Sequence, residues 1–364
     1  MIVLEERIEA LKKEGKKAGI DAFLVTSEKN MKYFAGFSTS AVERFAGIIV
    51  PVETGFPVVI VPRLEETKAK KSPLKEIRSY SDSENPKFVL NKTLKELRLE
   101  NARLGVEGTL PFKFYQMLVA ASSKMTAEDA SKVFSQLRCV KSRQEQEMIE
   151  KAASIVAEGI KAGIEFAKPG VTEMAISGQI EGAIKENGGE SVPFCLVLSG
   201  PNSALPHGET SNRKVSENDV VLMDVGAVYK GYNGDLTRTI FVGEATKKQR
   251  EVYDCVAKAQ EAAISRVKPS VMAEEIDAAA RRVIEKAGYG EYFTHRTGHG
   301  LGLDVHEEPY IVQGNKTMLR SGMVFTVEPG IYLDKFGVRI EDNMVVSNTK
   351  GKMLSHLSKE LVVI

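Results

Sequence analysis

The chain of 364 residues has few cysteines, and their arrangement argues against two classes of protein. Cys139, Cys195 and Cys255 lie far apart in the sequence and form no CxxC spacing. A disulfide framework and a zinc site built from thiolates both need cysteines in regularly spaced pairs. An odd number of scattered thiols fits a reducing compartment, so the sequence predicts a cytoplasmic protein.

An excess of charge of one sign is also missing. The 50 Lys and Arg residues stand against 49 Asp and Glu residues, which leaves a formal net charge of +1. A nucleic-acid-binding domain generally carries a clear excess of positive charge. The lysine-rich segment 65–76 is interspersed with Glu and Ser, as on a solvent-exposed surface. We therefore expect no nucleic-acid partner.

Long apolar runs are absent as well. No apolar run approaches the ~20 residues that are needed to span a bilayer. The first residues read MIVLEERIEALKKEGKKAGI, which is the pattern of an amphipathic helix and lacks the apolar stretch of a signal peptide. We expect neither a membrane span nor an export signal.

Length and patterning together predict two domains. A single hydrophobic core usually stops growing at ~250–300 residues, which this chain exceeds. In residues 1–130, helical patterns alternate with short apolar strands such as DAFLVTS and FPVVIVP, which indicates a small α/β domain. The polar segment 124–141 has a helical pattern and is typical of a connection. Residues 131–364 then form the second domain of an α+β protein.

The second domain contains an internal repeat with a spacing of one hundred residues. The motif KPGV at 168–171 follows the helical pattern of 143–167, and KPSV at 268–271 follows that of 248–267. In both copies proline ends one helix and glycine closes the next. We interpret the repeat as a duplication. A coincidence between two helical hairpins is the alternative.

Two aspartates interrupt apolar runs in the first copy. Asp224 lies in VVLMDVGAVY and Asp235 in YNGDLTRTIFVG, both typical of buried strands. Burying an ionised carboxylate without a partner is very costly. In a hairpin whose loop has an even number of residues, their separation of eleven places both on one face of the sheet. A bulge at Gly231 would change this register.

Two glutamates interrupt apolar runs in the same way in the second copy. Glu328 lies in MVFTVEPGIYL and Glu341 in VRIEDNMVV, thirteen positions apart across the turn DKFG. Their odd separation again predicts one face, and alternation places Arg339 beside Glu341 and turns Asp342 to the other side. Four carboxylates come together if the two copies pack face to face.

A cluster of four carboxylates needs positive charge, because like charges in close proximity repel strongly. One arginine cannot neutralise four acids. Carboxylate oxygens with a single imidazole suit a pair of divalent ions such as Mn, Co or Zn, ~3.5–4 Å apart. A network of ion pairs with Lys and Arg is the alternative, and it explains one buried acid better than four.

Histidine is scarce but concentrated, since three of the five histidines lie in HRTGHGLGLDVHEEP, residues 295–309. Glycines at 298, 300 and 302 allow the backbone to approach closely and to adopt positive φ angles. We therefore predict that His299, which two of these glycines flank, reaches a metal ion.

The other histidines are predicted to lie at the substrate or at the surface. His295 and His306 are close enough in sequence to His299 to face the substrate. A lone histidine is more often a core residue with satisfied hydrogen bonds, which remains the alternative for His295. His207, in the turn-rich SGPNSALPHGE, is a further candidate, and His356 is interpreted as a surface residue.

Five motifs in this order and spacing resemble the pita-bread metallopeptidases of family M24, in particular the group of Xaa-Pro dipeptidases (prolidases) and aminopeptidases P. The motifs are SGPNSALPHG, the hairpin that ends in DLTRT, HRTGHGLGLDVHEEP, TVEPGIY and GVRIED. The resemblance covers essentially the whole chain, including the N-terminal α/β domain. It implies a C-terminal pita-bread fold with an internal pseudo-twofold duplication, and a homodimer.

The resemblance also implies roles for individual residues. Two divalent metal ions would be held by Asp224, Asp235, His299, Glu328 and Glu341, with Asp235 and Glu341 bridging the ions. The substrate site would be lined by His207, His295, His306 and Arg339. Glu328 is expected to take a proton from the attacking water, His306 to hold the oxyanion and His207 to bind the proline end. The expected substrate is a small peptide with proline as its second residue.

Several related functions remain open at the level of the sequence. The compact length favours a dipeptidase, and an aminopeptidase P that acts on longer Xaa-Pro peptides is the alternative. A methionine aminopeptidase would share the ligand pattern, but it generally lacks an N-terminal α/β domain of this size. A non-catalytic peptide-binding module of the same fold is disfavoured by the complete set of ligands.

Overall fold

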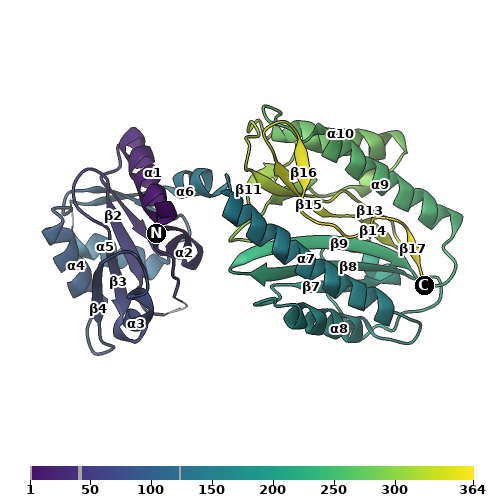
Figure 1. The fold of residues 1–364 in the computed structure, drawn as a ribbon, viewed down its shortest axis with the longest axis horizontal. Helices are drawn as coiled ribbons and strands as arrows, with labels where there is room; N and C mark the ends of the chain where they lie inside the picture. Colours follow the sequence, from purple (N-terminus) through teal and green to yellow (C-terminus); the bar gives the residue numbers. More distant parts are fainter. Residues whose placement is uncertain (1, 40–42, 123) are drawn as a thin grey trace. The chain divides into compact units, whose positions relative to one another are not determined.

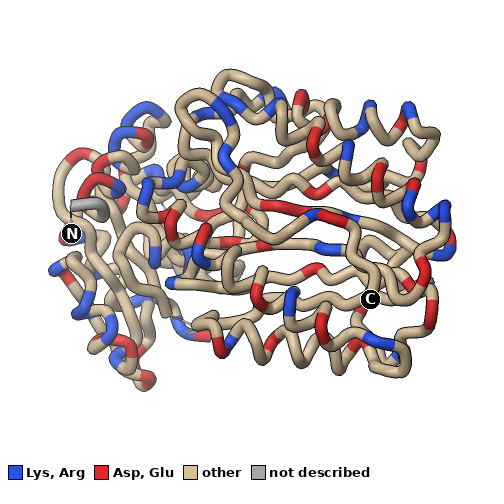
Figure 2. Tube along the Cα trace, turned by 45° about the vertical axis from the view of Figure 1, so that its right-hand side comes forward, with Lys and Arg blue, Asp and Glu red and all other residues tan. Residues whose placement is uncertain are grey.

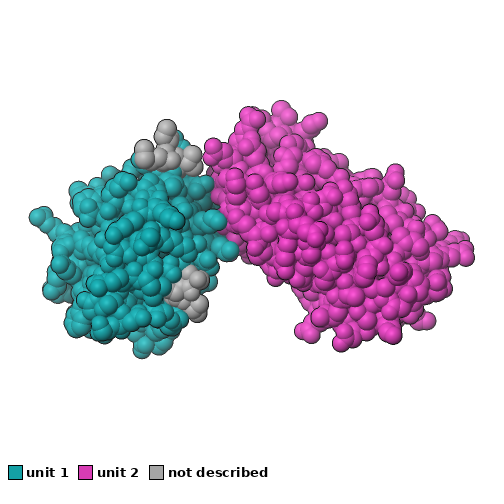
Figure 3. Space-filling view, turned by 60° about the horizontal axis from the view of Figure 1, so that its bottom comes forward, with its two compact units in different colours: residues 1–138 teal, residues 139–364 magenta. Residues whose placement is uncertain are grey.

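The computed structural model describes residues 2–39, 43–122 and 124–364 (Figure 1). It consists of two compact units, residues 1–138 and residues 139–364 (Figure 3). The division follows Arg138, whereas the sequence suggested residue 130. Lys and Arg alternate with Asp and Glu along the chain (Figure 2). No helix formed by the described residues is long and apolar enough to cross a membrane.

Unit 1 is built around a six-stranded sheet with the order β4-β3-β2-β1-β5-β6. The central strand β1 pairs antiparallel with β2 and parallel with β5. Apolar runs such as VVIV make β3 buried along its whole length, as expected for a strand that is covered on both faces. The strands are β1 Ala22–Val25, β2 Gly47–Pro51, β3 Val58–Pro62, β4 Glu76–Tyr80, β5 Arg103–Val106 and β6 Thr126–Asp129. The helices are α1 Ile2–Ala18, α2 Glu28–Ala35, α3 Glu66–Ala69, α4 Pro86–Glu96, α5 Phe112–Ala121 and α6 Ser131–Arg138, with a short 3-10 turn at Arg63–Glu65.

The segment 124–141 corrects one prediction, because it is not helical throughout. Its first part forms β6, which extends the sheet by pairing in parallel with β5. The helix α6 follows and packs on α1 within the same unit. The polar sequence TAED carries no apolar alternation because β6 lies at the edge of the sheet with its side chains largely accessible. Backbone pairing, rather than side-chain burial, decides its structure.

Unit 2 has two halves, each with two helices followed by antiparallel strands (Figure 1). The first half consists of α7 Arg143–Phe166, α8 Glu173–Glu186, β7 Cys195–Ser199, a 3-10 turn at Gly200–Ala204, β8 Val220–Tyr229 and β9 Tyr232–Phe241. The second half consists of α9 Lys247–Arg266, α10 Ala273–Lys286, a 3-10 turn at Gly290–Tyr292, β10 Gly298–Gly300, β11 Glu307–Ile311, β12 Val324–Val327, β13 Gly330–Tyr332, β14 Gly337–Arg339, β15 Asp342–Val346, β16 Gly351–Met353 and β17 Val362–Val363.

The two halves repeat each other at the predicted spacing. Helices α7 and α9 end one hundred residues apart, as do α8 and α10. Both long helices begin with a capping box, formed by Ser142 with Glu145 and by Thr246 with Gln249. The position after each Lys-Pro pair has a positive φ angle, although it is glycine in one copy and Ser270 in the other. The agreement extends to details of backbone conformation, which favours duplication over coincidence.

The loop of the hairpin β8–β9 has an even number of residues, which is the condition for Asp224 and Asp235 to lie on one face of the sheet. Its turn consists of Lys230 and Gly231, both with positive φ (49° and 80°), as in a two-residue type I′ turn. Asp224 lies opposite Thr237, and Asp235 lies opposite Gly226. The two aspartates are therefore diagonal neighbours on one face of the sheet, and no bulge at Gly231 shifts the register.

The second hairpin consists of two ladders, β12–β15 and β13–β14, separated by a gap at residues 328–329 and 340–341. The strand register is the same on both sides of this gap. Val327 pairs with Asp342 in β12–β15, and Gly330 pairs with Arg339 in β13–β14. The same register places Glu328 opposite Glu341 inside the gap. There the backbone N–H of Glu328 donates to Thr297 O (2.8 Å), and that of Glu341 donates to Thr237 O (3.1 Å). The bond of Glu328 therefore stays within its own half of the unit, next to β10, whereas that of Glu341 joins its half to β9 of the other sheet.

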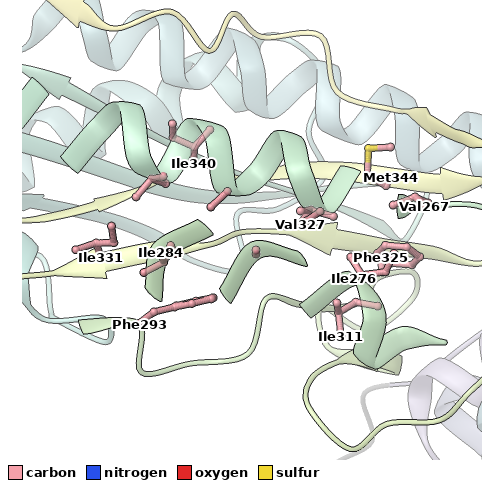
Figure 4. Packing of buried hydrophobic residues seen from close by; sticks show 14 of the residues in the cluster. Val267, Ile276, Ile284, Phe293, Ile311, Phe325, Val327, Ile331, Ile340 and Met344 are labelled. Atoms are coloured by element: carbon pink, nitrogen blue, oxygen red, sulfur yellow. The ribbon is translucent and has the colours of Figure 1, made fainter. Parts of the chain in front are cut away.

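A hydrophobic cluster that includes residues of α9 packs against the strands on either side of this gap (Figure 4). Val327 and Ile340, which directly precede the two glutamates, are fully buried in it. Gln260 of α9 donates from its side-chain amide to the carbonyl oxygens of both residues, at 3.1 and 3.2 Å. The packing of α9 against the strands therefore sets the backbone positions of the two acids.

Candidate active site

Three predicted ligands form one buried cluster in unit 2. Asp235 comes from β9, His299 from β10 and Glu341 from the gap before β15. Each offers one ligand atom, and these atoms lie within 4.8 Å of one another. All three residues are at most 3% exposed. The cluster thus joins the two halves of the unit, as the face-to-face packing of the two copies required.

Glu328 lies beside this cluster. Its Oε1 is 3.3 Å from Nε2 of His299, which in turn is 3.7 Å from Oδ2 of Asp235. The hydroxyl of Thr326 donates to the same Oε1 of Glu328 (3.1 Å). The glutamate is therefore held close to the histidine by its own strand.

Two carboxylate oxygens of the cluster have no hydrogen-bond partner among the described residues. They are Oδ1 of Asp235 and Oε1 of Glu341, both buried. A buried acceptor without a partner costs roughly 1–3 kcal/mol, and more when it is charged. The second oxygen of Glu341 accepts from Thr237 Oγ1 (2.7 Å). The orphaned oxygens are the donor atoms that a divalent cation would use, so the residues fit a metal ion.

The electrostatics of the acids follow from burial and mutual repulsion. Burial raises the pKa of Asp235 well above its ordinary value, and the charges of Asp224 and Glu328 raise it further. Glu341 has a strongly raised pKa for the same two reasons. Burial raises the pKa of Glu328 to about 7, against the opposing effect of the Arg339 guanidinium. Without a cation, these acids hold protons more tightly than ordinary carboxyl groups do.

Asp224 stands apart from the other predicted ligands. Its Oδ2 accepts a hydrogen bond from Nη2 of Arg339, in a closely spaced ion pair. Nε of Arg339 donates to Thr237 Oγ1 (3.1 Å), and this hydroxyl donates to Glu341. The arginine thus contacts Glu341 through Thr237, and its direct partner is Asp224.

The imidazole of His299 is uncharged and shielded. Burial lowers the pKa of His299 to about 3, and the charge of His306 lowers it further. Nδ1 of His299 lies 3.1 Å from the carbonyl oxygen of Gly300, which leaves Nε2 directed to the acids. A neutral imidazole with one nitrogen hydrogen-bonded to a carbonyl is the usual form of a metal-binding histidine.

The predicted substrate histidines differ in exposure. The ring of His306 is exposed and lies 4.0 Å from that of His299, centroid to centroid. His295 is largely enclosed, and burial lowers its pKa to about 3. His207 is exposed, and its charge adds a small lowering to the pKa of both His295 and His306. His356 is exposed and pairs with Glu150 (3.3 Å) away from these groups.

Tyr332 belongs to the site and was missed from the sequence. Its hydroxyl lies 2.9 Å from Nε2 of His295 and accepts from Nη1 of Arg339 (2.7 Å). The tyrosine therefore links the histidine to the arginine that holds Asp224. A signal was present, because Tyr332 follows Glu328 by an even number of positions and alternation would place both on one face.

The glycines around His299 are needed for space. A Cβ atom on Gly298 would lie 1.9 Å from Thr326 O, and one on Gly300 would lie 2.2 Å from Glu308 O. The positive φ angles predicted for Gly298, Gly300 and Gly302 are not observed, so that part of the prediction is wrong. Strands on either side of β10 approach its backbone so closely that no side chain fits.

Comparison with known proteins gives two family matches that together span most of the chain. Residues 147–348 match the model of metallopeptidase family M24, and residues 7–140 match the creatinase/prolidase N-terminal domain. The M24 match covers more than half of the chain.

Individual relatives cover the chain from end to end. The Xaa-Pro dipeptidase of Pyrococcus furiosus is 36% identical over 364 residues, which is 99% of this chain and 100% of that protein. The crystal structure of recombinant prolidase from Thermococcus sibiricus has a TM-score of 0.93 at 41% identity and 99% coverage of both chains. X-Pro aminopeptidase from Thermotoga maritima has a TM-score of 0.88 at 33% identity, covering 98% and 99% of the two chains.

These matches confirm the predicted α+β class, with a separate N-terminal domain and a C-terminal pita-bread fold. They also agree with the motifs on which the resemblance was based. The chain belongs to metallopeptidase family M24 and carries the creatinase/prolidase N-terminal domain ahead of its M24 region.

Proposed function

We propose that the protein is an Xaa-Pro dipeptidase that uses two divalent metal ions, Mn, Co or Zn. The relatives named Xaa-Pro dipeptidase and prolidase support the substrate class. The observation that carries the proposal is the pair of buried carboxylate oxygens without partners, Oδ1 of Asp235 and Oε1 of Glu341, beside the uncharged His299.

The five predicted ligands fit two cations better than one. Asp235 and Glu341 each offer a second oxygen, so each can bridge two ions. The contact of Asp224 with Arg339 engages Oδ2, and a carboxylate has enough lone pairs to bind a cation through Oδ1 as well. His299 and Glu328 complete the set. When bound, divalent ions polarise the scissile carbonyl and lower the pKa of the attacking water.

The side chains around the ligands supply the remaining steps. Glu328, beside His299, would take the proton of the attacking water and later return it to the proline nitrogen. That nitrogen has no hydrogen in the substrate and must be protonated as it leaves. His306, whose ring lies beside that of His299, would donate to the developing oxyanion.

The substrate would be held by the remaining groups of the site. His207 is assigned to the proline end of the dipeptide, where an imidazolium would pair with the terminal carboxylate. His295 and Arg339, which both contact the hydroxyl of Tyr332, would support the substrate from the side of β13. Arg339 acts on the ligands through Asp224 and Thr237.

Aminopeptidase P activity is the second candidate, because the X-Pro aminopeptidase of Thermotoga maritima is also similar over its full length. The two activities differ in whether the site accepts residues after proline. Comparing Met-Pro with Met-Pro-Gly as substrates separates them. A dipeptidase cleaves Met-Pro and rejects Met-Pro-Gly, and the reverse result would assign an aminopeptidase P.

Metal dependence and the remaining alternatives are tested in the same assay. Dialysis against a chelator should abolish cleavage of Met-Pro, and added Mn or Co should restore it. Full activity of the metal-free protein would refute the dinuclear proposal. Cleavage of Met-Gly but not Met-Pro would indicate a methionine aminopeptidase, and a metal-loaded protein that cleaves none of these peptides would be a binding module.

Three further predictions belong to this proposal. The protein is expected to be a homodimer, which light scattering after size-exclusion chromatography would test. It is expected to be cytoplasmic, on the pattern of its cysteines. The N-terminal domain is expected to comprise residues 1–130 and the catalytic domain residues 131–364, and expression of the two pieces would test that boundary.

A further inference from the structure

Glu173, at the start of α8, is a buried carboxylate outside the proposed metal site. Its side chain is fully buried, and no Lys or Arg forms an ion pair with it in the described part of the chain. Its charge is instead solvated by neutral donors, which is unusual because a buried charge normally has a charged partner or a metal. These donors reveal what the residue does.

All the side-chain hydrogen bonds of Glu173 go to one loop, residues 199–211, which we name the His207 loop. Oε1 accepts from the backbone N–H of Ser199 (2.6 Å) and from its hydroxyl (2.7 Å). Oε2 accepts from the backbone N–H of Ser211 (3.0 Å) and from its hydroxyl (2.6 Å). Nδ2 of Asn202 donates to both oxygens, at 3.0 and 3.2 Å. One carboxylate thus closes both ends of the loop.

The middle of the His207 loop is fixed to the other half of the unit. Ser203 Oγ accepts from the backbone N–H of Gly337 (3.0 Å), and Nη1 of Arg339 lies 3.5 Å from the carbonyl oxygen of Pro206. His207 follows Pro206 directly and is exposed. Its position therefore depends on Glu173 at the base of the loop and on β14 at its middle.

We propose that Glu173 is a positioning residue that holds His207 in place for substrate binding. The proposal rests on the proposed function only in the choice of substrate. Glu173 does not touch the ligands, so its loss should weaken the binding of the dipeptide more than it slows the chemical step.

Glu173→Gln is the sharpest test, because the amide has the same shape as the carboxylate. Each oxygen of Glu173 accepts from one backbone N–H. An amide has one accepting end and one donating end, so either orientation leaves one N–H of the loop facing an NH₂ group. We expect KM for Met-Pro to rise about tenfold, with kcat changed by less than about threefold.

The chain offers a matched control in Glu107 of unit 1. Glu107 is 4% exposed, and its two oxygens accept from the backbone N–H groups of Thr26 and Ser27, from the Thr26 hydroxyl and from Asn30. Glu107→Gln therefore breaks the same kind of contacts outside unit 2, in a unit without predicted site residues. It should lose comparable stability and leave KM unchanged. Equal KM changes in both variants would overturn the proposal.

The link to His207 is tested by a double mutant. His207→Ala should raise KM as Glu173→Gln does, and the combined variant should show little further increase, because both changes remove one contact. Fully additive effects would overturn the proposal. Asn202→Ala, which removes the donor inside the loop, is a milder variant and should raise KM in the same direction by a smaller factor.

A second readout does not depend on peptidase activity. Hydrogen exchange of backbone amides in residues 199–211 should accelerate in Glu173→Gln, whereas the β8–β9 hairpin should exchange as in the wild type. Faster exchange in an enzyme without Xaa-Pro activity would refute the proposed function and retain the anchoring role. Unchanged exchange in the loop would refute that role even if the enzyme is a dipeptidase.

Discussion

Glu341 and Asp342 are adjacent in the chain and almost completely buried. They differ in whether protein groups satisfy their carboxylate oxygens. Asp342 accepts from Arg238 (2.9 Å), Ser355 (2.7 Å) and Gln260 (3.0 Å). Glu341 has one oxygen without a partner among the described residues and a strongly raised pKa. Strand alternation turns one acid to the inner face and the next to the other side, so a single peptide step separates a structural acid from a candidate ligand.

The same contrast runs through the whole of unit 2. Glu173 and Asp277 resemble Asp342, because protein groups satisfy them; Asp277 accepts from Thr297 (2.7 Å) and Arg281 (2.7 Å). Asp235 resembles Glu341, with an orphaned oxygen. Burial alone therefore does not mark a functional acid. An acid whose hydrogen-bonding capacity the protein leaves unfilled is the one that indicates an external cation.

Among the variants that distinguish candidate ligand acids from acids satisfied by protein groups, Glu328→Gln should have the largest effect on turnover. The amide keeps the shape of the side chain but cannot take a proton, so kcat for Met-Pro should fall by ~10³-fold or more. Metal content is measured alongside by elemental analysis. A variant that keeps its metal and turns over at the wild-type rate would remove Glu328 from proton transfer.

Changing each of the two neighbours tests the comparison directly. Asp342→Asn leaves Arg238 buried without its charged partner, which should cost ~3–5 kcal/mol of unfolding free energy while the bound metal remains. Glu341→Gln should lose metal, and the metal-free variant should be no less stable than metal-free wild type, since the amide replaces a carboxyl group whose ionised form is disfavoured by burial and by its neighbours. Denaturant unfolding and metal analysis of both variants check this. The reversed pattern would contradict the division into structural and ligand acids.

His306→Ala should have a smaller effect than Glu328→Gln. If the imidazole donates to the oxyanion, kcat should fall by ~10²–10³-fold with the metal retained. His356→Ala is the matched control, because His356 is also exposed but contacts Glu150, and it should leave kcat unchanged. An unchanged kcat in His306→Ala would exclude this histidine from the chemistry.

The sequence was sufficient to predict which acids share a face. The odd separations of Asp224 from Asp235 and of Glu328 from Glu341 required only the period of a β-strand and an even turn, and the turn at Lys230-Gly231 provides it. The spacing of the repeat was equally visible, because proline and glycine mark helix ends through local backbone geometry. These predictions therefore depended only on local backbone geometry.

What the sequence did not reveal depends on contacts between distant segments. The pairing of Arg339 with Asp224 joins residues 115 positions apart, and the anchoring of the His207 loop by Glu173 spans up to 38 positions. Alternation fixes the face of a side chain but not its partner across the interface of two sheets. The edge strand β6 was missed for a related reason, since its polar sequence takes a β conformation only by pairing with β5.

Proton release on metal binding should give the smallest but most specific signal. In the metal-free protein, burial and mutual repulsion raise the pKa of Asp235 and Glu341 strongly and that of Glu328 to about 7. These acids therefore hold their protons more tightly than ordinary carboxyl groups do, and an incoming cation must displace them. His299, whose pKa is lowered to about 3, is already neutral and releases none.

The affinity for metal should therefore depend on pH. Metal affinity should rise as the pH increases from 5.5 toward 8, by up to about tenfold per pH unit for each proton released, and should level off above the raised pKa values. Arg339 opposes the shift of all three acids by favouring their ionised forms, and Arg296 adds to this effect at Glu328. Calorimetric titration with Mn in buffers of different ionisation enthalpy counts the protons. Binding at pH 6.5 without proton release would mean that the acids are already ionised, and the contrast between Glu341 and Asp342 would lose its electrostatic basis.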